Sequence, residues 1–337
     1  MTTEAVSGSA TAVAHPSLAM IKYWGKQDTT ENIPATPSLA VTLDGLDTTT
    51  HVVLYPSEAS GSPSDIVKID GVSQPIQRYK GFFDAFRRLA SENGIDLTRW
   101  WFMAESSSNF PSAAGLASSA SGFAALVLAC AGASGLGDVP DTRDLSAVAR
   151  VGSASAARSL WGGFTQLNAG AKSAAPVKDA SWWPNLRIIV AEVEKGPKSI
   201  SSRMAMESTR LHSPYYKAWL EDSSILFRQA MAGLESRDLS ILGPAIRKSY
   251  MRMFATMFAS DPPIVYWKPG SLSLINACEK IRGDGIQAWE TMDAGPQVKV
   301  FCLDENTEAI SRRLQMALPG VNLRICTVGG APVLRNG

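Results

Sequence analysis

Small, hydroxyl-bearing residues, NFPSAAGLASSASG at positions 109–122, stand directly before the apolar run FAALVLACAGA. Glycine and alanine let the backbone approach a ligand closely, and the N–H groups and dipole of a following helix favour phosphate. The hydroxyls of Ser118, Ser119 and Ser121 are suitable ligands for phosphate oxygens or for magnesium. The stretch therefore predicts a phosphate-binding loop, although a tightly packed helix start would explain the same small residues.

This stretch differs from the common nucleotide-binding motifs. The chain contains no G-x-x-x-x-G-K-[ST] segment, so it is not an ordinary P-loop. It also lacks a G-x-G-x-x-G segment after a strand, and dinucleotide binding is therefore not expected.

Four further stretches carry groups that suit an anionic substrate. They are IKYWGK (21–26) with two lysines, GSASAARSLWGG (152–163) with one arginine, KSISSR (198–203), and ETMDAGPQVKV (290–300) with a carboxylate at a strand end. Each alone has an ordinary explanation: a solvated lysine pair, a structural arginine or a turn aspartate. Together they supply hydrogen-bond donors for phosphate, cations and one lone carboxylate.

Composition limits the classes of function. A chain of 337 residues favours two domains at roughly 100–200 residues each. Lys plus Arg is 32 against 31 for Asp plus Glu, so no bulk charge recruits nucleic acid or a membrane surface. The four cysteines and three histidines are scattered, which argues against a zinc site. The N-terminus has no signal-peptide pattern, and we expect a soluble, cytoplasmic protein with reduced thiols.

Hydrophobic periodicity predicts two different halves. Before about residue 185 we expect strands at 38–43, 50–56 and 99–106, a hairpin around Asp70-Gly71, and helices at 78–94, 117–133 and 141–153. After it we expect strands at 186–194, 286–292, 297–305 and 323–328, and helices at 200–210, 215–235, 237–259, 271–282 and 306–317. With the extra helices set aside, the second half reads β–α–β–β–α–β, the split βαβ ferredoxin-like pattern.

The motifs resemble those of the mevalonate diphosphate decarboxylase family of the GHMP kinase superfamily. The matching segments are 10–43, 107–134, 151–165, 195–204, 261–267 and 291–296, in the family's order. The resemblance implies an α+β, two-domain GHMP kinase fold. Residues 1–185 would form a domain like ribosomal protein S5 domain 2 with the phosphate loop, and residues 186–337 a ferredoxin-like domain. The active site would lie between them, and family members are commonly homodimers.

The resemblance also implies an activity with ATP and Mg²⁺. ATP would phosphorylate the 3-hydroxyl of mevalonate 5-diphosphate, and phosphate and CO2 would then leave to give isopentenyl diphosphate. Asp293 matches the family's essential aspartate, placed to accept the hydroxyl proton, and Lys22 matches the lysine beside it, which keeps the carboxylate ionised. Arg158 matches the arginine that holds the substrate carboxylate in a bidentate contact.

Further site residues follow from the same resemblance. Ser153 and Ser155 would flank the substrate, and its diphosphate would be held by Tyr23, Lys26, Ser202 and Arg203. The ATP phosphates would be held by Ser106, Ser107, Ser108, Gly115, Ser118, Ser119 and Ser121, and the magnesium ion by Ser118 and Ser119.

Four positions depart from the family's usual pattern and raise the question of selectivity. Gln27 stands where arginine is usual, Thr36-Pro37 replace Asn-Ser or Ser-Ser, Phe254 replaces histidine, and the last turn reads GGAP instead of GxGP. We expect these positions to lie around the substrate and the nucleotide, so the substitutions could change which substrate is bound.

Several alternatives remain open. A decarboxylase of mevalonate 5-phosphate shares the fold, but Lys26 favours the diphosphate. A kinase that stops at the 3-phosphate is disfavoured by Asp293. A further possibility is a related enzyme that acts on another 3-hydroxy acid. Another is a ligand-responsive binding protein, but such a protein should have lost the phosphate loop or the pair Asp293 and Arg158.

Overall fold

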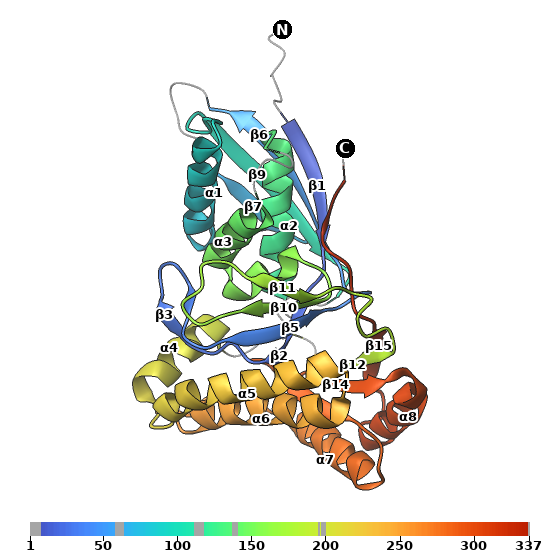
Figure 1. Cartoon of the computed structure of the whole chain (residues 1–337). Coiled ribbons are helices and arrows are strands. Elements are labelled where there is room, and N and C mark those ends of the chain that lie inside the picture. The colour runs from blue at the N-terminus through green and yellow to red at the C-terminus, as the bar shows by residue number, and fades with distance from the viewer. Residues whose placement is uncertain are drawn as a thin grey trace.

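The computed structural model describes residues 8–57, 64–110, 118–136, 141–194, 196 and 200–335. In Figure 1 the chain forms two stacked units, with the first half of the sequence above and the helices of the second half below. The chain end returns to the upper unit, where β16 (Val333–Arg335) pairs with β1 (Gly8–Ala14).

A six-stranded sheet forms the upper part of the N-terminal unit. Its order is β16-β1-β6-β9-β7-β8, and every pairing is antiparallel except that of β7 with β9. Besides β1 and β16, this sheet contains β6 (Thr48–Pro56), β7 (Ile66–Ile69), β8 (Val72–Ser73) and β9 (Trp100–Ser108). The helices of this unit are α1 (Lys80–Glu92), α2 (Ser118–Ala133) and α3 (Thr142–Gly152). A core rich in phenylalanine and alanine joins these helices to the sheet.

A second sheet lies lower in the same unit, next to the C-terminal helices (Figure 1). Its order is β11-β10-β5-β2, with β2 (Ser17–Ile21), β5 (Ser38–Thr42), β10 (Phe164–Leu167) and β11 (Ala175–Lys178). A short hairpin of β3 (Lys26–Asp28) and β4 (Ile33–Pro34) extends from it, and the 3-10 helix η2 (Ala154–Leu160) precedes β10. Side chains of β2 and β5 share one hydrophobic core with the C-terminal unit, which fixes the two units against each other.

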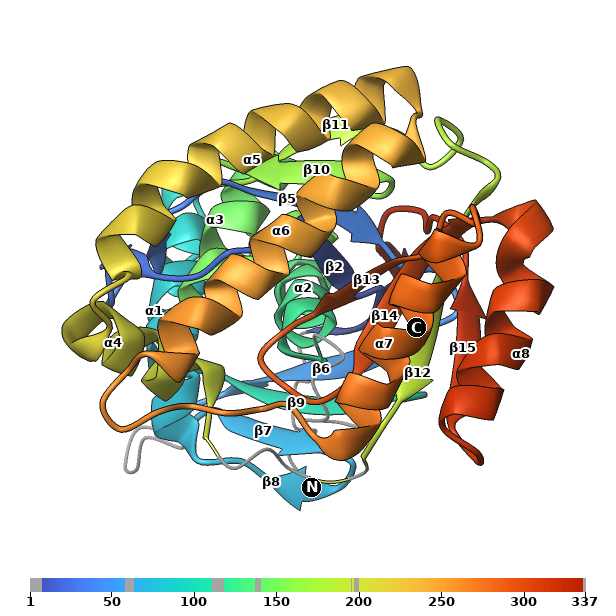
Figure 2. The ribbon, with the colours of Figure 1, turned by 90° about the horizontal axis from the view of Figure 1, so that it is seen from below.

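The C-terminal unit is built on the sheet β13-β14-β12-β15, in which all pairings are antiparallel. Its strands are β12 (Leu186–Glu192), β13 (Trp289–Met292), β14 (Val298–Leu303) and β15 (Asn322–Cys326). Its helices are α4 (Ser202–His212), α5 (Tyr216–Ser236), α6 (Leu239–Phe258), α7 (Pro269–Gly283) and α8 (Thr307–Ala317). Figure 2 shows α7 in front of this sheet when it is seen from below, while α5 and α6 lie side by side across the molecule. The order β12-α7-β13-β14-α8-β15, with α4 to α6 inserted after β12, confirms the predicted split βαβ pattern.

The long elements lie close to their predicted bounds, whereas some short strands were not predicted. The helix expected at 78–94 spans 80–92, and the Asp70-Gly71 hairpin is present between β7 and β8. No strand was predicted at 8–21, where β1 and β2 form. All five residues of β2 are buried, so this strand shows no alternation of apolar and polar residues. Within the described part of the chain, we find no helix with the length and apolar character needed to cross a membrane.

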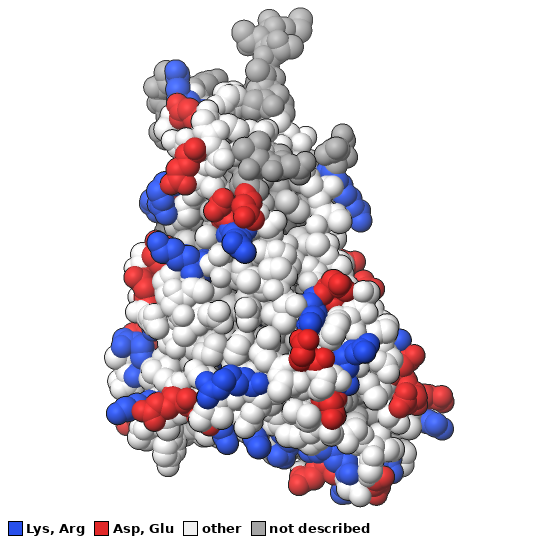
Figure 3. All heavy atoms as spheres, viewed as in Figure 1, with Lys and Arg blue, Asp and Glu red and all other residues white. Residues whose placement is uncertain are grey.

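Basic and acidic side chains lie next to each other on the face shown in Figure 3, without a large patch of one sign. This distribution agrees with the formal net charge of +1. Inside the molecule, at the junction of the two units, basic side chains gather instead, namely Lys22, Lys26, Arg78 and Arg203.

Candidate active site

A cavity of about 750 Å³ lies between the two units. This volume is within the range of small-molecule sites, roughly 300–1,000 Å³. Its described wall includes the end of β2, the starts of α2 and α4, the segment before η2, and the turn after β13. Four basic residues line it, namely Lys22, Lys26, Arg78 and Arg203, and Asp293 is the single carboxylate among the described lining residues. The cavity is therefore suited to a small anion that also meets one carboxylate.

Asp293 lies directly after β13 and is held between two lysines. Lys22 Nζ is 2.7 Å from Asp293 Oδ1, and Lys299 Nζ is 3.1 Å from Oδ2. The two lysine side chains are 1% and 2% exposed, whereas the aspartate is 25% exposed and faces the cavity. Lys22 also donates a bond of 2.8 Å to the carbonyl of Ala19. Its backbone N–H donates to Ser249 Oγ of α6, so the end of β2 is anchored on the C-terminal unit.

The charges of this group determine how it ionises. Burial alone would raise the pKa of Asp293, but the charges and hydrogen bonds of Lys22 and Lys299 outweigh it and hold that pKa well below its usual range. Burial lowers the pKa of Lys22 to about 8, even though its pairing with Asp293 acts in the opposite direction. Asp293 is therefore a carboxylate anion at neutral pH, with lysine as its direct neighbour.

Arg158 lies in η2, just behind the cavity wall. It is 2% exposed, and its Nη1 donates a 2.6 Å hydrogen bond to Ser38 Oγ, while its Nε has no partner. Burial lowers its pKa to about 10, and its charge acts on Lys22, Tyr23 and Asp293. A buried guanidinium with an unused N–H requires an anionic or polar acceptor, which the described side chains around it do not supply.

The serines of the η2 segment connect this region to the start of α2. Ser153 and Ser155 line the cavity, with their hydroxyl oxygens 3.0 Å apart. Ser119, in the first turn of α2, lies 3.3 Å from Ser153 Oγ. A row of hydroxyls therefore connects the first turn of α2 to the start of η2 along the cavity wall.

A second cluster of polar groups lies where β3 approaches α4. Lys26, Ser202 and Arg203 line the cavity there. Burial, followed by the charge of Arg203, lowers the pKa of Lys26 to about 8. Tyr23 Oη is buried without a hydrogen-bond partner, as is Asn32 Oδ1. Adjacent cations with buried polar atoms nearby fit a multiply charged anion.

The YWGK segment that carries Lys26 is fixed by contacts with α4 and α5. Trp24 Nε1 donates to Thr209 Oγ1 at 2.9 Å, and Trp219 Nε1 donates to the carbonyl of Trp24 at 2.8 Å. Gly25 has a φ of +109°, and a Cβ at this position would lie only 2.0 Å from Tyr216 Oη. A glycine is required here because both the backbone conformation and the space exclude a side chain.

The serines predicted to bind ATP fall into three groups. Ser106, Ser108, Ser118 and Ser119 line the cavity. Ser107 is exposed and points to the opposite face of β9, because successive strand residues alternate. Ser121 is fully buried beneath the wall, and Gly115 lies outside the described residues.

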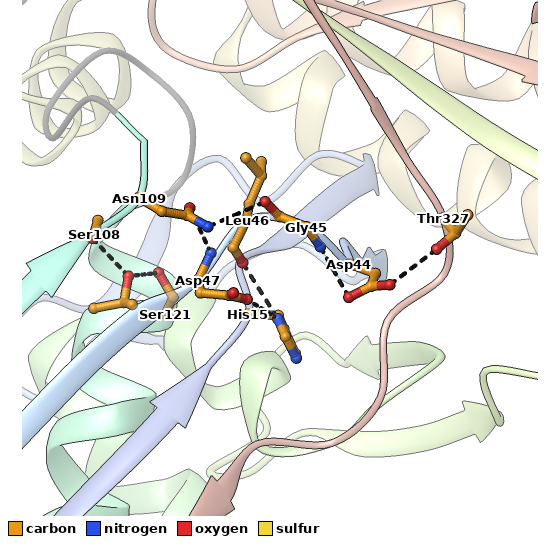
Figure 4. Close-up of polar contacts among 10 residues, drawn as sticks. His15, Asp44, Gly45, Leu46, Asp47, Ser108, Asn109, Ser121 and Thr327 are labelled. Atoms are coloured by element: carbon orange, nitrogen blue, oxygen red, sulfur yellow. Dashed lines mark hydrogen bonds and ion pairs between the residues drawn. The ribbon is translucent and has the colours of Figure 1, made fainter.

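Thr48 connects the two ends of the segment that contains the expected phosphate loop. Its Oγ1 lies 2.8 Å from Ser108 Oγ and 2.7 Å from Ser121 Oγ (Figure 4). Ser121 therefore contacts Thr48 inside the fold and positions α2, whereas Ser108 and Ser118 remain at the cavity. Serines of the same motif therefore have different surroundings, because side chains alternate between the faces of β9 and because one face of α2 is buried.

The neighbouring turn at residues 44–47 holds Asn109, the residue that begins the motif. Asn109 Oδ1 accepts a 2.9 Å hydrogen bond from the N–H of Asp47, and its Nδ2 donates to the carbonyl of Gly45 at 3.3 Å (Figure 4). Asp47 in turn lies 2.7 Å from His15 Nδ1. The asparagine of NFP thus has a structural function that its position in the motif did not reveal.

The donor set at the start of α2 fits Mg²⁺ carried by a nucleotide. Among the described residues no cluster of three or more His, Cys, Asp or Glu side chains could hold a metal ion by itself. The available ligands are hydroxyl oxygens at Ser106, Ser108, Ser118 and Ser119. Mg²⁺ in phosphoryl-transfer sites takes few protein ligands and completes its shell with phosphate oxygens and water, so hydroxyls of this kind are sufficient.

The four departures noted in the sequence lie away from the described wall of this cavity. Gln27 is exposed, Thr36 Oγ1 accepts from the N–H of Trp24, and Phe254 is fully buried in the C-terminal core. Gly330 borders a second, smaller pocket beside Trp161. Among the described residues, these substitutions therefore affect packing and surface outside the lining of the cavity.

Fold and site together define a class. Two α+β units, the second ferredoxin-like, enclose a basic, serine-lined cavity beside the start of α2, and this arrangement is the two-domain GHMP kinase fold.

Comparison with known proteins gives the family within that class. Residues 14–178 match the model for the diphosphomevalonate decarboxylase-like N-terminal domain, and residues 188–332 match that for the mevalonate 5-diphosphate decarboxylase C-terminal domain. The diphosphomevalonate decarboxylase of Saccharomyces cerevisiae is 32% identical over 95% of this chain and 85% of its own length. The corresponding enzyme of Eremothecium gossypii is 32% identical over 88% of this chain and 78% of its own.

Solved structures agree. A structure of the mevalonate diphosphate decarboxylase from Enterococcus faecalis has a TM-score of 0.87 at 34% identity, covering 98% of this chain and 99% of that one. The Staphylococcus aureus enzyme has a TM-score of 0.88 at 31% identity, with 98% of both chains covered. A similar structure, at 35% identity and a TM-score of 0.87 over 98% of this chain and 99% of its own, was solved in complex with MVAPP, AMPPCP and magnesium. The chain belongs to the diphosphomevalonate decarboxylase family.

Proposed function

We propose that this chain catalyses the ATP-dependent decarboxylation of mevalonate 5-diphosphate to isopentenyl diphosphate, ADP, phosphate and CO2. The observation that carries the proposal is the placement of Asp293 between Lys22 and Lys299, at the wall of a basic cavity between the two units. The relatives that share the fold are decarboxylases of this substrate, and one was solved with MVAPP, an ATP analogue and magnesium.

Asp293 would bind the tertiary 3-hydroxyl and accept its proton as the oxygen attacks phosphorus. A carboxylate with a pKa below its usual range is a weak base for an alcohol, so the proton moves while the new O–P bond forms and not beforehand. Its main effect is to orient the hydroxyl in line with the phosphoryl group, since phosphoryl transfer depends chiefly on positioning and charge neutralisation.

Arg158 would hold the substrate carboxylate, with Ser153 and Ser155 on either side of the substrate. The unpartnered Nε of Arg158 supports this assignment because a carboxylate is the acceptor that a planar guanidinium fits best. At the other end, Tyr23, Lys26, Ser202 and Arg203 would bind the diphosphate.

The nucleotide would occupy the serine-lined part of the cavity. Ser106, Ser108, Ser118 and Ser119 would hold its phosphates, with Ser118 and Ser119 also within the magnesium site. When bound, ATP would supply the phosphoryl group, and its magnesium ion would neutralise the negative charge that develops during transfer. Ser107 and Ser121 are left out of this contact set because one side chain faces outward and the other is buried.

Once the 3-hydroxyl is phosphorylated, loss of phosphate and of CO2 leaves the alkene. Positive charge develops at the carbon that loses phosphate, and the nearby negative diphosphate of the substrate would stabilise it. Arg158 would hold one end of the substrate during this step. The residues proposed to bind its diphosphate would hold the other end, so the substrate keeps one conformation.

The direct test is purified protein with ATP, magnesium and each of mevalonate, its 5-phosphate and its 5-diphosphate, with ADP and CO2 followed together. Equal formation of ADP and CO2 from the 5-diphosphate supports the proposal. ADP without CO2 identifies a kinase, preference for the 5-phosphate identifies the monophosphate decarboxylase, and neither product with any substrate contradicts a decarboxylase of this substrate class.

We expect Lys26→Met to weaken selection of the diphosphate. KM for mevalonate 5-diphosphate should rise about 10- to 100-fold with little change in kcat, because the lysine contacts a part of the substrate that does not react. kcat/KM for the 5-phosphate should fall less. Lys217→Met, at an exposed position on α5, is the matched control. Equal losses with both substrates would remove Lys26 from the diphosphate site.

We expect kcat/KM to fall above about pH 8. Lys22 and Lys26 both have a pKa of about 8, so raising the pH removes the proton from the lysine beside Asp293 and from the one proposed to bind diphosphate. Asp293 stays ionised throughout, and the loss is therefore on the alkaline side. Profiles of kcat/KM and kcat should differ, with the kcat limb at higher pH, because bound diphosphate stabilises protonated Lys26. A profile that stays flat to about pH 10 would contradict this assignment.

Three further proposals concern the whole molecule. The domain boundary near 185, giving 1–185 and 186–337, is supported by the start of β12 at Leu186 and by the gap between the two family matches. A cytoplasmic location is supported by four free, buried cysteines. A homodimer rests on the family resemblance, and light scattering of the purified protein measures it.

A further inference from the structure

Lys299 lies on β14, a strand in which five consecutive residues, Val298 to Cys302, are buried. Val298 and Val300 face the core that is covered by α7 and α8. Lys299 faces the opposite side, as does Phe301, which packs in the core shared with β2 and β5. The lysine therefore points into the junction between the two units, and its side chain is 2% exposed.

A buried ammonium is unfavourable unless it is paired, and its ion pair here is with Asp293. Asp293 already has a buried counterion in Lys22, which binds its other oxygen. Two lysines around one carboxylate exceed what charge neutralisation requires. The second lysine therefore calls for an explanation beyond neutralising Asp293.

The geometry supplies that explanation, because each lysine binds a different oxygen and the two come from different units. Lys22 follows β2 of the N-terminal unit, whereas Lys299 belongs to the strand that pairs with β13 and lies opposite Thr291. With both oxygens bound, the plane of the carboxylate is fixed. A carboxylate offers about four acceptor positions, so positions remain for a ligand in the cavity.

We propose that Lys299 is a positioning residue that, together with Lys22, fixes the plane and the charge of the Asp293 carboxylate toward the substrate hydroxyl. This inference rests on the proposed function of the same site. It gives Lys299 no contact with substrate, and its effect is transmitted through Asp293. The charged groups that act on Asp293 are Lys22 after β2, Lys299 on β14 and Arg158 in η2.

The test is Lys299→Met against Lys299→Arg, with kcat, KM and ATP binding measured together. We expect kcat of Lys299→Met to fall about 10- to 100-fold, as for other residues that orient a catalytic group, with KM and ATP affinity nearly unchanged. Lys299→Arg keeps a cation beside Asp293 and should restore most of the lost kcat. A lysine that serves only packing would be replaced no better by arginine than by methionine.

Thr291→Val is the matched control, since Thr291 lies opposite Lys299 in the same sheet, is fully buried and has an unpartnered hydroxyl. It should keep the wild-type kcat. If Lys299→Met does not fold, Lys299→Gln carries the test, and the same loss of kcat is expected. Wild-type kcat in Lys299→Met, or an equal loss of kcat in Lys299→Met and Lys299→Arg, overturns the proposal.

Failure of the proposed function can be distinguished from failure of this inference. If the proposed function is wrong, the wild-type protein itself forms no ADP or CO2 from mevalonate 5-diphosphate. The inference is then tested by thermal unfolding against pH, for the wild type and Lys299→Met, each with and without Asp293→Asn. The Asp293-dependent stability is present above the unfolded-state pKa and lost as pH falls through the folded-state pKa, so in Lys299→Met it should be lost at higher pH. Identical pH dependence in both backgrounds overturns the inference.

Discussion

Asp293→Asn is expected to lower kcat about 10³-fold or more while leaving ATP affinity nearly unchanged. The amide removes the negative charge that Lys22 and Lys299 share, and its NH2 group would place a donor against an ammonium. The substrate hydroxyl then loses its acceptor, and two buried cations lose their counterion. The nucleotide is proposed to bind at the serines near α2, on another part of the wall, so its affinity should persist.

Steady-state kinetics and binding of an ATP analogue by calorimetry measure the two quantities. Asp84→Asn is the control, because Asp84 also accepts a hydrogen bond from a lysine, Lys80, but lies on α1 and outside the cavity lining. It should retain wild-type kcat. A kcat for Asp293→Asn within tenfold of the wild type would show that the carboxylate is not the group that orients the hydroxyl.

Long periodic elements were predictable because their core-facing residues follow one repeat. In α1, Phe82, Phe83, Phe86 and Leu89 are buried at helical spacing, and the predicted helix differs from the observed one by only two residues at each end. Strands buried on both faces lack such a repeat, and β2 was missed for this reason. The pairing of β16 with β1 joins the two ends of the chain, which no local pattern can indicate.

The site was predictable to the extent that its motifs belong to a family. Residue type alone left Asp293 as an ordinary strand-end aspartate, and its contact with Lys22 joins residues 271 positions apart. Lys299 was missed because a lysine between valines in a strand is expected to face solvent. The signal was present, since a lysine in an otherwise apolar strand directly after DAGP needs a partner if the strand is buried on both faces.

Residue type also failed to separate the serines that contact the cavity from those that do not. Ser107 on β9 faces outward, and Ser121 on α2 is buried against Thr48. Chemistry at a site depends on which face a side chain takes, and in a run of small residues no hydrophobic pattern indicates that face.

Arg158→Lys should lower kcat/KM for mevalonate 5-diphosphate about 10²- to 10³-fold, although the charge is kept. A buried, hydrogen-bonded charge contact costs about 2–5 kcal/mol when it is broken, and lysine cannot form the two parallel hydrogen bonds of a guanidinium. The site is adapted to that shape, because Nη1 donates to Ser38 and leaves Nε unpaired. ADP and CO2 should decline together, since a substrate that is poorly oriented is phosphorylated slowly.

Arg87→Lys is the matched control for this substitution. Arg87 makes two hydrogen bonds of 2.8 and 2.7 Å to Asp65 and lies outside the cavity lining, so its replacement should lower thermal stability and leave kcat/KM unchanged. The decisive comparison uses a substrate analogue whose carboxylate is replaced by a neutral amide, with phosphorylation followed as ADP release. The wild type should discriminate strongly against this analogue and Arg158→Lys much less, because the arginine accounts for the preference. Equal discrimination by both proteins would mean that Arg158 does not bind the carboxylate, and its buried guanidinium would then serve only to hold η2 against β5.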